Sequence, residues 1–173
     1  MVLSFINSRH VLTPSLQTST TLSRGFVKTP GCSCKICKEA KFCSIIFSPT
    51  VPDNPKPICC KSVNVVYVIF FTCGQPYVGK TGQPKPRWAN HKAHIRNLHK
   101  TCNLASHCST LHKDHMVGEG KLFTTEDVKQ NLTFALLESI GEEGNSEDLK
   151  ALEETWRDRL QSWSPLGLNT KED

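Results

Sequence analysis

One stretch limits the possible folds more than any other: the apolar run Val63–Phe71, which reads VNVVYVIFF. β-Branched and aromatic residues dominate it, and such residues favour a buried β-strand. The run is too short to cross a membrane, which takes about 20 apolar residues. A turn sequence, CGQP, follows it, and YVG at Tyr77–Gly79 then predicts the returning strand. We therefore expect a β-hairpin in a globular domain with no membrane partner.

The sequence on either side of this hairpin divides the chain into three parts. Residues 1–30 are rich in Ser and Thr and contain no acidic residue. They predict a disordered leader or linker, and residues 1–28 are also compatible with a mitochondrial presequence. Residues 31–62 form a segment rich in Cys and Pro, and residues 63–170 form a mixed α/β domain. A chain of 173 residues has room for one such domain and an appendage.

Further elements can be placed after the hairpin. The sequence KTGQPKP contains a Gly and two Pro and predicts a loop. Arg87–His99 then has apolar residues near helical spacing, and residues 103–113 predict a second, short helix. Leu132–Ile140 predicts a third strand. A last helix is expected with Ser146 as its N-cap and with acidic residues in its first turn, where they favour the helix dipole.

Charge is distributed unevenly along the chain. Residues 1–125 carry 16 Lys and Arg against 4 Asp and Glu, whereas residues 126–173 carry 5 against 12. A basic body with an acidic final segment suggests a polyanionic partner for the first part. An ordinary solvated basic surface would have the same composition, so charge alone leaves both interpretations open.

Nine cysteines in a chain without a convincing secretory leader indicate reduced thiols and metal binding more than a disulfide framework. Cys34 and Cys37 form a C-x-x-C motif, which can present two thiolates to one tetrahedral zinc ion. A closed structural site needs two further ligands. The candidates are Cys59 or Cys60 before the strand, Cys73 in the hairpin turn, and Cys32 as a substitute. The alternative is a set of unrelated thiols.

Five polar side chains near the hairpin suggest a phosphate site. Tyr67 and Tyr77 are ten residues apart and are expected to face each other across the hairpin, and Lys80 follows shortly after. Arg87 and His91 are four apart, so they share one face of a helix. Each residue alone has an ordinary explanation, as a core tyrosine or a solvated cation. Gathered at one edge, they would bind a phosphodiester and include groups that can move protons.

The last helix can supply an acidic residue. Its apolar stripe consists of Leu149, Leu152, Trp156, Leu160 and Trp163. On a helical wheel Glu153 lies about 60° from the centre of that stripe, and Glu154 lies about 160° away. Glu154 is therefore expected in solvent, and Glu153 at the edge of the buried face. There a carboxylate needs a cation, either a lysine or a divalent metal ion.

With these residues in place, the sequence resembles the GIY-YIG endonuclease family, in the version attached to Penelope-like retroelements. VVY (Val65–Tyr67) stands where the family has GIY, and YVG stands where it has YIG. Arg87, His91 and Glu153 match the two helix residues and the metal-binding acid. Asn169 in PLGLN matches the family's late asparagine. The Penelope-like features are CKIC upstream, Cys60, Cys73, His107 and the late stretches LEETW and SPLGLN. Val65 replaces the family's first glycine, and Phe70 stands where those elements have a further Cys.

The resemblance implies an α+β fold, a small three-stranded antiparallel sheet flanked by helices. It implies a metal-dependent DNA endonuclease that hydrolyses phosphodiester bonds, as in retroelement integration. Glu153 would hold Mg²⁺ or Mn²⁺, and the cysteine segment a structural Zn²⁺. DNA is the expected partner, with a reverse transcriptase acting in trans, and the nucleus is the expected location.

The resemblance also implies a role for each site residue. Tyr77 would take the proton from the attacking water, assisted by the positive charge of Lys80 and the metal, and Tyr67 would position water or phosphate. Arg87 would neutralise charge on the phosphorane, and His91 would hydrogen-bond the nucleophile or the phosphate. Gly79 and Asn169 would support the local geometry.

Two other functions remain open. The chain could be a catalytically inactive nucleic-acid-binding module derived from a retroelement, using its basic body for contact. It could also be a protein-interaction domain stabilised by zinc.

Overall fold

The computed structural model describes residues 32–39, 58–99, 102–109 and 131–170. The expected leader, the proline-rich part of the cysteine segment and the end of the expected helix at 103–113 lie outside these ranges. At the centre is a three-stranded antiparallel sheet in the order β2-β1-β3. Its strands are β1 (Val65–Phe71), β2 (Pro76–Thr81) and β3 (Leu132–Ser139). The expected hairpin, third strand and α+β class are confirmed.

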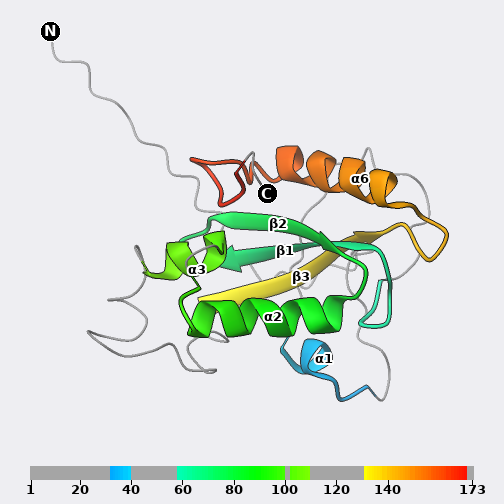
Figure 1. The fold of residues 1–173 in the computed structure, drawn as a ribbon, viewed down its shortest axis with the longest axis horizontal. Coiled ribbons are helices and arrows are strands. Elements are labelled where there is room, and N and C mark those ends of the chain that lie inside the picture. Colours follow the sequence, from blue (N-terminus) through cyan, green and yellow to red (C-terminus); the bar gives the residue numbers. More distant parts are fainter. Residues whose placement is uncertain (1–31, 40–57, 100–101, 110–130, 171–173) are drawn as a thin grey trace, which may run out of the picture.

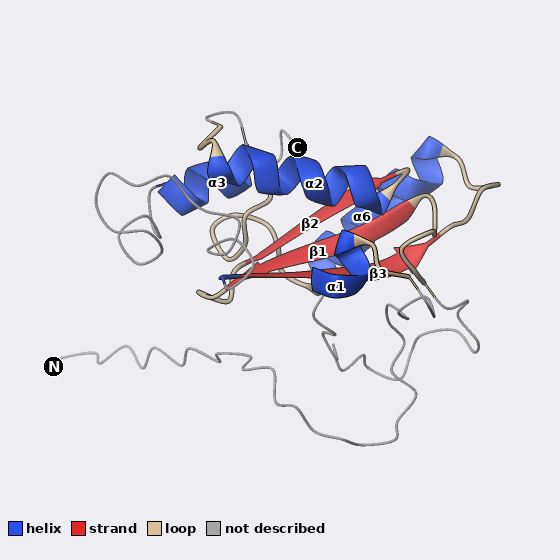
Figure 2. Ribbon diagram, turned by 90° about the horizontal axis from the view of Figure 1, so that it is seen from below, coloured by secondary structure: helices blue, strands red, loops and turns tan. Residues whose placement is uncertain are grey.

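Helices cover both faces of the sheet (Figure 1). On one face lie α1 (Lys35–Glu39), α2 (Pro84–Arg96) and α3 (Asn103–His107), which we call the α2 layer. The other face is covered by α6 (Ser146–Arg159), the α6 layer. In Figure 1 the strands lie between α6 above them and α2 below, and Figure 2 gives the view turned by 90°. None of the helices in the described ranges combines the length and hydrophobicity that a membrane crossing requires.

Each face of the sheet has its own core. Alternate residues of β1 point to opposite faces, which is why the strand reads as a continuous apolar run. Tyr67 and Ile69 join Trp88 and Ile95 of α2 in one core. The alternate β1 residues Val66 and Val68 form the other core with α6, and this core also contains Val78, Leu149 and Trp156.

Helix α2 begins earlier than the sequence predicts. Its first residue is Pro84, inside the stretch expected to be a loop, and Pro86 also lies in its first turn. The first backbone N–H groups of a helix have no partner within it, so prolines cost little there. The helix ends at Arg96 rather than His99, and Leu98 adopts a left-handed φ of 49°.

Helix α6 is capped one residue before the expected position. Asn145 is the N-cap, and its Oδ1 accepts hydrogen bonds from the backbone N–H groups of Glu147 and Asp148, both at 2.8 Å. Ser146 is the first helical residue instead. The acidic first turn is as predicted, and it stabilises the helix through its dipole.

Candidate functional site

The hydroxyl of Tyr67 lies at the centre of a hydrogen-bonded chain of three side chains. Tyr67 comes from the middle strand β1 and is fully buried. Arg87 donates from Nε to the Tyr67 hydroxyl over 2.9 Å, and His91 places Nε2 2.6 Å from the same oxygen. Arg87 and His91 reach one atom because they lie one turn apart on α2. Their expected common face is confirmed.

The protonation states of His91 and Tyr67 follow from their burial. Burial, with the nearby Arg87 and His94, lowers the pKa of His91 to about 3. The imidazole is therefore neutral at physiological pH, and its Nε2 can accept the phenolic proton. Burial also raises the pKa of Tyr67 above its usual range, the nearby Tyr77 adds to this, and Arg87 opposes it. The phenol stays protonated, poised between a guanidinium and a neutral base.

Tyr77 joins this group from β2, but not in the expected register. It pairs with Ile69, whereas Gly79 is the residue directly opposite Tyr67. The two tyrosines therefore lie diagonally on one face and do not face each other directly. The ring of His91 lies between them, with centroid distances of 5.5 Å to Tyr67 and 5.8 Å to Tyr77. We call Tyr67, Tyr77, Arg87 and His91 the tyrosine cluster.

Gly79 makes room for the ring of Tyr67. A Cβ atom at position 79 would overlap the Tyr67 hydroxyl and would lie 2.6 Å from its Cζ. No ordinary side chain fits there without displacing the phenol. This gives the supporting role predicted for Gly79 a physical reason.

Lys80 does not belong to the tyrosine cluster. It pairs with Val66, so it lies on the opposite face of the sheet, where α6 packs. Tyr77 and Lys80 are three residues apart on a strand, and an odd separation places side chains on opposite faces. The expectation that one edge gathers all five polar residues is corrected in this respect.

On that second face Lys80 meets Glu153 of α6. Glu153 is 4% exposed. Its Oε2 accepts from Lys80 Nζ at 2.5 Å, and its Oε1 accepts from Arg157 Nη2 at 3.1 Å. Glu154, the next residue, is exposed. The helical-wheel prediction for both glutamates is confirmed, and we call Glu153, Lys80 and Arg157 the glutamate cluster.

Arg157 is a site residue that the sequence reasoning missed. It lies one helical turn after Glu153, an i,i+4 spacing that favours an ion pair. That spacing was visible in the sequence. The sequence does not single out Arg157, because an arginine on an amphipathic helix is usually solvated, whereas this one is 5% exposed.

The two clusters lie on either side of β2. The Glu153 carboxylate contributes to the raised pKa of Tyr67, so the clusters interact electrostatically. Asn169 holds the strand between them. Its side chain accepts from Val78 N at 2.9 Å and donates to Val78 O at 2.8 Å, as a neighbouring strand would. This agrees with the structural role predicted for Asn169.

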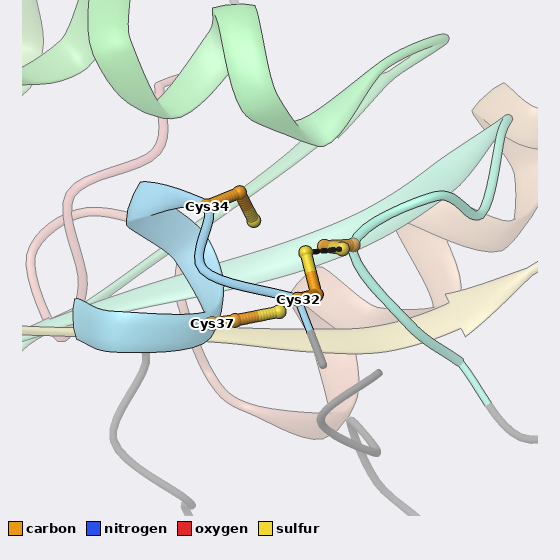
Figure 3. A group of neighbouring side chains, drawn as sticks. Cys32, Cys34 and Cys37 are labelled. Atoms are coloured by element: carbon orange, nitrogen blue, oxygen red, sulfur yellow. Dashed lines mark hydrogen bonds between the residues drawn. The ribbon is translucent and has the colours of Figure 1, made fainter. Parts of the chain in front are cut away.

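A third group consists of the four cysteines Cys32, Cys34, Cys37 and Cys60, whose sulfurs all lie within 4.8 Å of one another. Figure 3 shows the first three directed toward one centre from α1 and the residues before it. A tetrahedral zinc with bonds of about 2.3 Å separates its sulfurs by about 3.8 Å. Cys32 and Cys60 are 3.6 Å apart. Hydrogen bonds from Cys34 and Cys60 lower the pKa of Cys32 to about 6, which favours the thiolate that a metal needs.

Cys73 does not belong to this group, and Cys32 occupies the ligand position that was expected for Cys73. Cys60 precedes β1 and Cys73 follows it, and seven strand residues span about 20 Å. The Cys73 sulfur instead lies 3.4 Å from His107 Nε2. Of the alternatives Cys59 and Cys60, the structure selects Cys60, since Cys59 lies outside the group.

We compared the chain with protein-family models, with curated proteins and with solved structures. None of the three comparisons returned a match.

Proposed function

We propose that the chain is a metal-dependent DNA endonuclease of the GIY-YIG type. The proposal depends on the hydrogen bonds that join Arg87, Tyr67 and His91. The buried phenol oxygen of Tyr67 lies within 2.9 Å of both the guanidinium Nε and the neutral imidazole Nε2. A core tyrosine needs one hydrogen-bond partner, and here two catalytically capable groups converge on one oxygen. A buried carboxylate, Glu153, lies across a single strand from it.

Each residue then has a part in hydrolysis. Arg87 neutralises charge that develops on the phosphate, and it is partly exposed, so a substrate can reach it. Tyr77 takes the proton from the attacking water, while Tyr67 orients water or phosphate. His91 is 4% exposed and bonded to Tyr67. It acts by holding that phenol rather than by touching the substrate.

Glu153 is the residue suited to hold Mg²⁺ or Mn²⁺. Magnesium is commonly bound through one or two carboxylates, with water and substrate phosphates completing its shell. The Glu153 carboxylate already pairs with two cationic groups, so a metal ion would have to take the place of one of them. A bound ion would polarise the scissile phosphate and stabilise the leaving oxygen.

The charge of the α2 layer supports a nucleic-acid substrate. No Asp or Glu occurs between Ile58 and Ser109. Exposed basic and titratable side chains of this stretch include Lys85, His94, Arg96 and His99. A phosphate backbone could approach this surface without repulsion. A retroelement origin, a reverse transcriptase partner and a nuclear location stay predictions from the resemblance.

We further propose that the four-cysteine group binds one structural zinc ion. Cys37→Ser should lose the metal and destabilise the domain, because the zinc would tie α1 to Cys60, which precedes β1. Cys73→Ser should retain about one zinc per chain and serves as the control. Elemental analysis of both purified variants tests this, and equal zinc content in both would overturn it.

Nicking of supercoiled plasmid tests the main proposal. The parent protein should convert the plasmid to the open-circular form with Mg²⁺ or Mn²⁺, and EDTA should abolish the reaction. Salt-dependent DNA binding without nicking would favour the inactive nucleic-acid-binding module. Lack of DNA affinity at moderate salt would favour the protein-interaction domain.

A further inference from the structure

The two cations on Glu153 are held in different ways. The side chain of Arg157 is 6% exposed, whereas that of Lys80 is 33% exposed. One carboxylate with two cationic partners carries an excess of positive charge. That excess is more than pairing requires, so the role of the second cation needs an explanation.

Arg157 is the fixed partner. It is on the same helix as Glu153, and its guanidinium lies 5.0 Å from the ring of Trp163. Its buried Nε has no hydrogen-bond partner within the described ranges. A buried donor left unsatisfied destabilises a fold, so the guanidinium is not placed for its own hydrogen bonding. Its geometry serves Oε1 of Glu153.

Lys80 is the exchangeable partner. It comes from the edge strand β2, and its ammonium is a compact charge on a flexible stem. It reaches Oε2 of Glu153 with a single contact of 2.5 Å. A divalent ion on the same oxygen would lie about 2.1 Å from it, so the ammonium and the ion cannot both occupy that position.

We propose that Lys80 occupies the divalent-cation position on Oε2 of Glu153 and is displaced when the ion binds, while Arg157 keeps Oε1 in place. This inference rests on the proposed function, which gives the bound ion its role. The released ammonium, 33% exposed on the edge strand β2, is then free to meet a substrate phosphate. Ion and phosphate would thus strengthen each other's binding.

Binding of Mn²⁺ to the protein without DNA tests the exchange directly. Electron paramagnetic resonance of free Mn²⁺ measures binding with no need for activity. Lys80→Gln keeps a hydrogen-bond donor and removes the competing charge, so its Mn²⁺ affinity should rise about three- to fivefold. Lys85→Gln, which removes an exposed charge from α2, should bind like the parent. Glu153→Gln should lose the site, and adding Lys80→Gln to it should restore nothing.

The outcomes separate this inference from the endonuclease proposal. Equal Mn²⁺ affinity in the parent, Lys80→Gln and Lys85→Gln would overturn the exchange, as would a gain that survives Glu153→Gln. Lys80→Met gives a second test without a hydrogen-bond donor, and circular dichroism confirms that each variant is folded. If the parent fails to nick DNA while the affinity pattern holds, the exchange stands and the endonuclease proposal fails.

Discussion

The tyrosine cluster and the glutamate cluster, on the two faces of β2, differ in their balance of charged groups. In the first, one guanidinium serves an uncharged phenol oxygen beside a neutral imidazole. In the second, two cations serve one carboxylate. The first cluster can gain negative charge, because a phenolate or phosphate would meet Arg87. The second can gain a cation only by exchanging one.

The layers around the clusters extend this contrast. The stretch 58–109, which supplies the α2 layer except α1, contains no acidic residue. The α6 layer and the turn before it expose Glu142, Glu143, Glu147, Asp148, Glu154 and Asp158. A polyanion is therefore expected to approach the α2 side and to be repelled from the α6 side. Only the edge strand β2 separates the two environments, so a charged group bound at that edge interacts electrostatically with both.

The largest expected effect comes from removing the charge of Glu153. Glu153→Gln keeps the shape of the side chain but cannot hold a divalent ion, so plasmid nicking should be lost while DNA binding persists. Stability should also fall, because the buried guanidinium of Arg157 loses its carboxylate partner. Glu154→Gln changes an exposed residue of the same helix and should stay within about 0.5 kcal/mol of the parent in stability. Nicking rates and unfolding curves of both variants give the comparison. Cleavage by Glu153→Gln would place the metal site elsewhere.

Next in size is the loss of the cation in the tyrosine cluster. Arg87→Ala removes the guanidinium from the Tyr67 hydroxyl and from any phosphate there, so nicking should fall by about two orders of magnitude or more. Arg96→Ala, in the last turn of the same helix, should lower DNA affinity modestly and leave the cleavage rate of bound DNA intact. Single-turnover rates separate the two effects. Near-normal cleavage by Arg87→Ala would return Arg87 to the solvated surface.

A third test addresses the close approach of Gly79 in β2 to the ring of Tyr67. Gly79→Ala forces a methyl group against the Tyr67 phenol and should destabilise the domain by about 1–3 kcal/mol, as overpacking usually does. Gly82→Ala is the matched control, because its nearest neighbour would be 3.8 Å away at Asn64 Oδ1. Urea denaturation measures both. Equal stability of the two variants would mean that Tyr67 moves aside at little cost.

The smallest expected effect is the pH dependence due to His91. Its folded pKa of about 3 lies below the ordinary histidine pKa of 6.5. The unfolded chain therefore takes up the proton first, and stability is lost as the pH falls below about 6.5. Acidification to about pH 5 should cost on the order of 2 kcal/mol from this residue. His91→Gln should flatten that part of the stability profile, and an unchanged slope would contradict the burial of a neutral imidazole.

Most of the fold could be predicted from local sequence patterns. The β-branched run and the turn after it predicted the hairpin, and the apolar stripe of α6 placed Glu153 and Glu154 correctly. The sequence does not predict the start of α2, because two prolines usually indicate a loop, although the first helical turn tolerates them. The sequence predicts Ser146 rather than Asn145 as the cap, because serine and asparagine are about equally good at that position.

The candidate site was less predictable, because it depends on register and on contacts distant in sequence. The two-residue alternation of a strand could have placed Lys80 on the face opposite Tyr77. The diagonal offset of Tyr77 from Tyr67 could not be read from the sequence, since it depends on how the turn at 72–75 closes. The choice of Cys32 over Cys73 likewise depends on which end of β1 the cysteine segment reaches.

The pair of hydrogen bonds between the Asn169 side chain and the Val78 backbone has a consequence for folding during synthesis. The two residues are 91 positions apart in the chain. During synthesis β2 can pair with β1 soon after both emerge, but its outer edge stays without this partner until Asn169 has been added. An unpaired edge strand is a template for pairing with other chains. The nascent domain is therefore exposed to aggregation until one of its last described residues arrives, and a chaperone that shields β2 would be most useful in that interval.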